Sequence, residues 1–150
     1  MSNNQPQQQG GVILIEVLIA ILIFSFGILG LVGIQANAIK QSGDAKLRTD
    51  ASYLVGQIIS HMWIDRSNLA SYVHFPAGNN CTFTGSASTA ANVSGWLGST
   101  GQSGTVSALP NATVQIIVET GTNLVTVTVC WRAPQETATH NFTSTALISL

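Results

Sequence analysis

Charged side chains are scarce in this sequence. Only 7% of its 150 residues are Asp, Glu, Lys or Arg, whereas ordinary soluble domains contain about 25%. Hydrophobic residues reach 45%. A chain so poor in charge must keep much of its surface away from water or cover it with neutral polar groups. Both occur here, since the first third is aliphatic and the rest is rich in Ser, Thr, Asn and Gly. The length suffices for one domain.

Basic residues are particularly few. The chain has five Lys plus Arg and a formal net charge of −1. Binding to nucleic acid phosphates requires a basic patch. The scattered positions of these residues do not form one in the sequence: Lys40, Lys46, Arg48, Arg66 and Arg132. We therefore expect no nucleic-acid partner.

Sequence motifs typical of metal sites and of catalytic sites are also missing. There is no CxxC motif and no paired His spacing, so the sequence predicts no metal site and no cofactor. His61, His74 and His140 are dispersed and have no carboxylate companions in the sequence. Ser25 lies in an apolar run without a His or Asp at helical spacing. We expect no catalytic residues, and the chain is predicted not to be an enzyme.

Proline is absent between Val12 and Leu69. Within this stretch, residues 12–34 are apolar except for Glu16 and Ser25. As a helix the run would span about 34 Å, enough to cross a hydrocarbon layer of about 30 Å. Only a helix satisfies its own backbone polar groups in lipid. The sequence therefore predicts a single membrane-anchoring helix.

The helical pattern continues beyond this run, from Gln35 to about Leu69. Apolar residues recur at spacings of three and four, which places them on one face of a helix. The stripe comprises Leu47, Ala51, Leu54, Ile58 and Met62, and it is widened by Val55, Ile59 and Trp63. We expect one continuous helix whose second half buries this stripe against a domain of its own.

The last part of the chain alternates in a way typical of β-strands. Residues 74–110 form a connector rich in Gly, Ser, Asn and Thr, with a short helix expected near Ser88–Leu97, anchored by Trp96 and Leu97. Three strands are then predicted, separated by turns at 120–123 and 132–140: residues 112–119, 124–131 and 141–150. A long helix packed on a small antiparallel sheet is an α+β fold.

The chain has two cysteines, Cys81 and Cys130. They could be two buried free thiols, but an even count in a chain with an export-like apolar segment favours one disulfide. Closing a loop of that length would stabilise the fold by roughly 4 kcal/mol.

The strongest motif is GGVILIE at residues 10–16. It follows a Gln- and Asn-rich tract that we expect to be disordered. A charge within a lipid-facing helix costs several kcal/mol and needs a partner or a function. Glu16 could instead snorkel at the membrane edge, close to the positive end of the helix dipole.

This motif and the following LIEVLIAILIFSFGILGLVGIQ resemble the precursors of type IV pilins and pseudopilins. The resemblance implies that a prepilin peptidase cuts between Gly11 and Val12 and N-methylates Val12, and that Glu16 acts in subunit assembly. It also implies a pilin-like division of the chain: leader 1–11, transmembrane and assembly helix 12–34, amphipathic half 35–72 and globular β domain 73–150.

Within that family the sequence is most similar to PilV-type minor pilins. The implied partners are the peptidase, the major pilin, other minor pilins, the inner-membrane assembly platform and membrane lipid. The implied location is the inner membrane, with the C-terminal domain in the periplasm, and afterwards the pilus. The leader lacks the basic residues usual in the family, so this orientation follows from the resemblance and not from the positive-inside rule. Two other roles stay open: a pseudopilin of a type II secretion or DNA-uptake machine, and a tip adhesin presenting residues 76–108.

Overall fold

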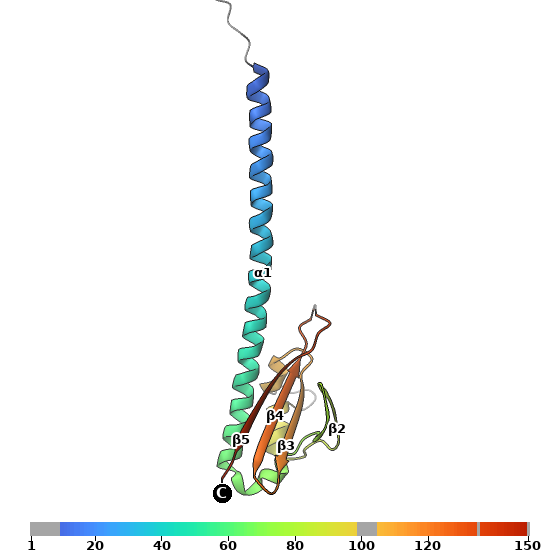
Figure 1. Cartoon of the computed structure of the whole chain (residues 1–150). Helices are drawn as coiled ribbons and strands as arrows, with labels where there is room; N and C mark the ends of the chain where they lie inside the picture. The colour runs from blue at the N-terminus through green and yellow to red at the C-terminus, as the bar shows by residue number, and fades with distance from the viewer. Residues whose placement is uncertain (1–9, 99–104, 135, 150) are drawn as a thin grey trace, which may run out of the picture. The chain divides into compact units, whose positions relative to one another are not determined.

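The computed structural model describes residues 10–98, 105–134 and 136–149. It divides into two units, Met1–Gly43 and Asp44–Leu150. In chain order the elements are α1 (Gly10–Ile64), η1 (Arg66–Tyr72), β1 (Ala77–Asn79), β2 (Thr82–Thr84), α2 (Ala91–Leu97), η2 (Thr105–Ala108), β3 (Thr113–Glu119), β4 (Leu124–Trp131) and β5 (His140–Leu147). Figure 1 shows these elements along the chain.

The described part of the first unit is helical throughout. Residues 11–43 are all exposed to solvent in the isolated chain. An 18-residue window of α1 reaches a mean hydropathy of 3.0, and none of it is buried. By length and composition α1 thus contains one candidate membrane span, because an exposed aliphatic surface of this kind is stable only in lipid or against other helices.

In the second unit, the last five turns of α1 bury the predicted stripe. Ala51, Leu54, Ile58 and Met62 are buried, and Leu47 packs partly against the core. Val55 and Ile59 widen the stripe as expected. The prediction was wrong for Trp63, which is 43% exposed. It lies one residue beyond Met62, and a step of 100° carries its side chain off the buried face.

Helix α1 ends at Ile64, five residues before the predicted end at Leu69. Asp65 leaves helical geometry with φ −106° and ψ 39°, and the chain tightens into η1. The carboxylate of Asp65 accepts hydrogen bonds from Asn68 Nδ2 at 2.6 Å and from the Tyr72 hydroxyl at 3.2 Å. It also accepts one from Asn92 Nδ2 at 3.3 Å, which ties the helix end to α2. These side-chain bonds, which no helical periodicity encodes, favour the turn.

The three predicted strands are present as the antiparallel sheet β3-β4-β5, lying side by side in Figure 1. The β3–β4 hairpin turns at residues 120–123, where Asn123 adopts φ 54° and its N–H donates to Glu119 O at 2.8 Å. Valines that alternate along the strands face one side and form the core with the α1 stripe. This buried face comprises Val114, Ile116, Val125, Val127, Val129 and Trp131. The α+β architecture is confirmed.

The predicted connector contains more structure than expected. β1 and β2 pair as an antiparallel hairpin, with Gly78 opposite Phe83, and η2 precedes β3. The expected short helix is α2, in which Trp96 is buried and Leu97 is partly buried. Val93 is its fully buried anchor, and the sequence analysis missed it. Residues 99–104 of the connector lie outside the described residues.

Candidate functional site

The beginning of α1 holds the residues that the GGVILIE motif singled out. The helix starts at Gly10, so Gly11 and Val12 already lie in its first turn. Residues 1–9 of the expected leader lie outside the described residues. Val12 and Glu16 are four residues apart, so they share a helix face and are separated by roughly 6 Å along the axis.

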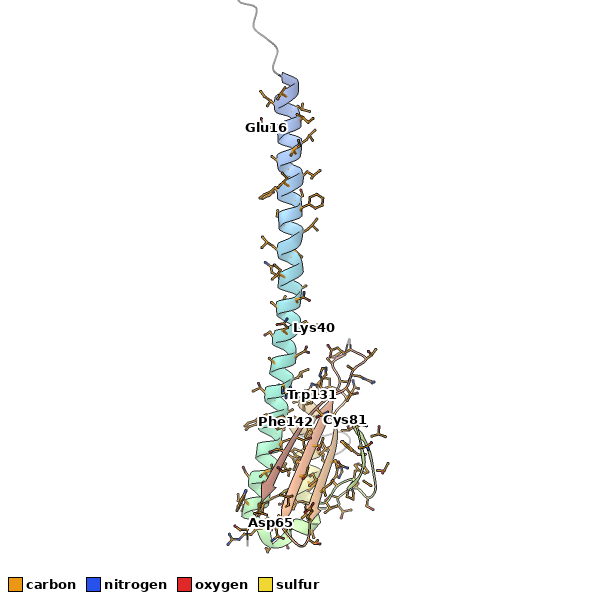
Figure 2. The ribbon with its side chains drawn as sticks, viewed as in Figure 1. Glu16, Lys40, Asp65, Cys81, Trp131 and Phe142 are labelled. Carbon is orange, nitrogen blue, oxygen red and sulfur yellow. A yellow bond between two sulfur atoms is a disulfide. The ribbon has the colours of Figure 1, made fainter. Side chains whose placement is uncertain are left out.

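Glu16 is surrounded by hydrocarbon along the helix surface. Its neighbours one turn away, Val12, Ile13 and Ile19, are large and exposed. Figure 2 shows Glu16 close to the start of α1. Within the described residues its carboxylate makes no hydrogen bond or ion pair. In water this is harmless, but in lipid or in a dry bundle an unpaired carboxylate costs several kcal/mol. In either of those two settings the segment presents one group that needs a partner from outside the chain.

Three glycines follow on the same helix. Gly27, Gly30 and Gly33 recur at every third residue, and a Cβ added at any of them would meet nothing within 4 Å. The fold of the isolated chain thus does not require glycine at these positions. Small residues at this spacing lower the helix surface and permit close approach by another helix, although glycine is also common in membrane helices generally.

The predicted disulfide between Cys81 and Cys130 is present, with the two Cα atoms 5.8 Å apart. Cys81 lies in the turn at the tip of the β1–β2 hairpin, and Cys130 belongs to the central strand β4. The side chain of Cys130 is fully buried. The bond therefore fastens the hairpin to the outer face of the sheet, the face opposite α1.

Gln115 is a positioning residue that the sequence analysis missed. It alternates along β3 with the buried Val114 and Ile116, yet it is itself only 6% exposed. Its Nε2 donates to Phe75 O at 3.0 Å and to Ala77 O at 3.1 Å. A Gln in an alternating strand normally predicts a solvent-facing position. The one available signal was the pair of cysteines, since a disulfide to β4 requires some segment to lie over that face.

The histidines remain dispersed in the structure. His61 is exposed, whereas His74 is buried and its Nδ1 accepts a hydrogen bond from Ser88 N–H at 3.0 Å. The expectation that none has a carboxylate companion was wrong for His140, whose Nε2 lies 2.7 Å from Glu136 Oε2. The described residues contain no group of three His, Cys, Asp or Glu side chains able to hold a metal.

Ser25 has a local partner in α1. Its hydroxyl donates to Ile21 O at 2.7 Å, one turn earlier. Such a bond satisfies a serine in an apolar helix without any second residue. Of the predicted site residues, the structure joins Cys81 to Cys130 and places Gly11, Val12 and Glu16 together on two helical turns.

Comparisons of the chain with models of protein families, with curated proteins and with solved structures found no match to any of them.

Proposed function

We propose that the chain is the precursor of a minor pilin of a type IV pilus, of the PilV type, which is cleaved and N-methylated by a prepilin peptidase and assembled through α1. One observation carries the proposal: Glu16, a carboxylate without a hydrogen-bond or ion-pair partner among the described residues, lies four residues beyond Val12 on an exposed aliphatic helix. The GGVILIE motif and the α+β architecture support it.

The chemistry of assembly follows from that carboxylate. Cleavage after Gly11 creates an α-amine on Val12, close to the depth of Glu16. When α1 leaves lipid for a helix bundle, Glu16 of one subunit pairs with the Val12 amine of a neighbour. A buried ion pair adds little net stability, but an unpaired buried charge is strongly destabilising. The pair therefore selects one axial register between neighbouring subunits.

The surface of the globular unit supports a pilus rather than a secretion pseudopilus. Threonines on β4 and β5 lie opposite one another on the outer face of the sheet: Thr126 pairs with Thr145, and Thr128 with Thr143. The Oγ atoms of Thr128 and Thr143 lie 3.0 Å apart. Such a neutral hydroxyl face suits exposure outside the cell.

The proposal is tested by replacing Glu16. The Glu16→Ala chain is expected to be processed and retained in the membrane but strongly depleted in sheared filaments, measured by immunoblot of both fractions. Ser25→Ala is the matched control, because it removes a polar group of the same segment that is satisfied within the helix. Normal recovery of Glu16→Ala in filaments would contradict the assembly role. Absence of the unmodified chain from sheared pili would favour the pseudopilin.

Processing is tested separately by mass spectrometry. Gly11→Glu is expected to leave the whole leader attached, while Gly10→Ala is expected to permit cleavage. The unmodified chain is expected to begin at an N-methylated Val12. A shortened chain from Gly11→Glu would refute the proposed cleavage site.

A further inference from the structure

A cavity of about 290 Å³ lies beside the first residues of β3. Its walls come from the β1–β2 hairpin and the segment before it, from α2 and η2, and from the edge of β3. The lining residues are His74, Phe75, Phe83, Leu97, Val106, Ala112, Thr113 and Val114. None of them carries a fixed charge, so the cavity suits a neutral ligand. At about 30 Å³ for each water-sized group, it holds roughly ten non-hydrogen atoms.

The cavity forms where the chain makes a single β-bridge to the edge of β3 and then leaves that edge. His74 and Ile116 exchange both backbone hydrogen bonds, His74 N–H to Ile116 O at 3.0 Å and Ile116 N–H to His74 O at 2.9 Å. Continuing this antiparallel register would place Pro76 opposite Val114, and proline has no N–H to donate. Phe75 adopts φ 43° and turns the chain away into the β1–β2 hairpin.

This departure leaves backbone groups of β3 without a strand partner. Backbone groups of alternate residues point to the same edge of a strand. Because Ile116 bonds outward to His74, the N–H and C=O of Val114 point to that edge as well. Within the described residues they make no hydrogen bond outside the strand. The wall at Val114 thus offers one donor and one acceptor.

His74 supplies a second donor. Its Nδ1 accepts the hydrogen bond from Ser88 N–H, so the neutral ring carries its proton on Nε2. Burial lowers the pKa of His74, which keeps the ring neutral at pH 7. Nε2 makes no hydrogen bond within the described residues, and it is not among the atoms sealed inside them. His74 lines the cavity, and as a whole the residue is only 6% exposed.

We propose that this cavity is a binding site for a small neutral amide bearing a branched aliphatic or aromatic group. The apolar group packs against Phe83, Leu97 and Val106. The amide carbonyl accepts a hydrogen bond from His74 Nε2–H or Val114 N–H, and the amide N–H donates to Val114 O. The site goes beyond the proposed pilin function and does not depend on it.

The test uses the full chain in detergent micelles, titrated with N-acetyl-L-valinamide and followed by NMR. The backbone amide of Val114 and the imidazole of His74 are expected to shift saturably, while the amide of Thr145 on the distant strand β5 stays unchanged. The isosteric anion N-acetyl-L-valine is expected to bind at least about tenfold more weakly, because its carboxylate would lose hydration in a site without a cation.

Leu97→Trp is the cavity-filling variant, since Leu97 is only partly buried and lines the site. It is expected to abolish the shifts at Val114, and Leu147→Trp, at an exposed position of β5, is the matched control that should retain them. Retained amide dispersion shows that each variant is folded. Absence of saturable shifts in the unmodified chain, equal binding in Leu97→Trp, or equal binding of the anion would each overturn the proposal.

Discussion

The side chain of Gln115 holds the backbone of Phe75 through a hydrogen bond of 3.0 Å from Nε2 to the carbonyl oxygen. The same Nε2 lies 3.1 Å from Ala77 O. One carboxamide thus donates to the backbone carbonyls of two residues that lie outside the sheet β3-β4-β5. Together with the disulfide, this contact determines where the β1–β2 hairpin lies on the outer face of the sheet.

Replacing Gln115 with Leu is expected to lower the free energy of unfolding by about 1–3 kcal/mol, because buried carbonyl oxygens lose their donor. Gln115→Glu is expected to cost more at pH 7, since a carboxylate would face those oxygens. Denaturant unfolding of the full chain in micelles measures both. Thr145→Val, on the exposed part of the same face, is the control and should change stability by no more than about 0.5 kcal/mol.

The double change Cys81→Ala and Cys130→Ala removes the disulfide. It is expected to lower the free energy of unfolding by roughly 4 kcal/mol, because the bond closes a long loop between cysteines with a sequence separation of 49. Treatment of the unmodified chain with a reductant should lower its stability by a similar amount and leave the double variant unchanged. An unaltered unfolding midpoint in the double variant would show that the bond does not constrain the unfolded chain.

Ile58 and Trp63 test which face of α1 is buried in the globular unit. Ile58→Ala is expected to cost about 2–5 kcal/mol, because Ile58 is fully buried and truncation leaves a cavity. Trp63→Ala is expected to change the free energy of unfolding by less than about 1 kcal/mol, since its indole remains largely in solvent. Both are measured by urea unfolding in micelles, and equal costs would contradict the observed orientation of α1.

Acidification is expected to destabilise the globular unit through His74. Burial lowers the pKa of His74 in the folded state below its ordinary value of 6.5. The unfolded chain therefore binds the proton first, and stability falls as the pH drops below about 6.5 towards the folded-state pKa. Comparing urea midpoints at pH 7.5 and 5.5 measures the effect. His74→Gln should flatten the dependence, whereas His61→Gln, at an exposed position, should leave it unchanged.

Strong, local periodicity predicted the regular parts of the fold. The α1 stripe from Leu47 to Met62 repeats every three to four residues, and the valines of β4 alternate. Both patterns exist because burial is decided by direction around a helix or across a strand. Positions that depend on another part of the chain were not predictable in this way. Gln115 is buried because the β1–β2 hairpin lies over it, and α1 ends at Ile64 because Asp65 bonds to Tyr72 and Asn92.

The candidate assembly site follows almost entirely from the sequence, because Gly11, Val12 and Glu16 are neighbours along one helix and their relation needs no tertiary contact. The sequence by itself also predicted the apolar first half of α1, the three main strands and the bond between the two cysteines. Only the tertiary structure decided what lies on the outer face of the sheet. The hairpin, the buried carboxamide of Gln115 and the cavity beside Val114 all arise because Pro76 has no N–H to continue the ladder and Phe75 turns the chain away from β3.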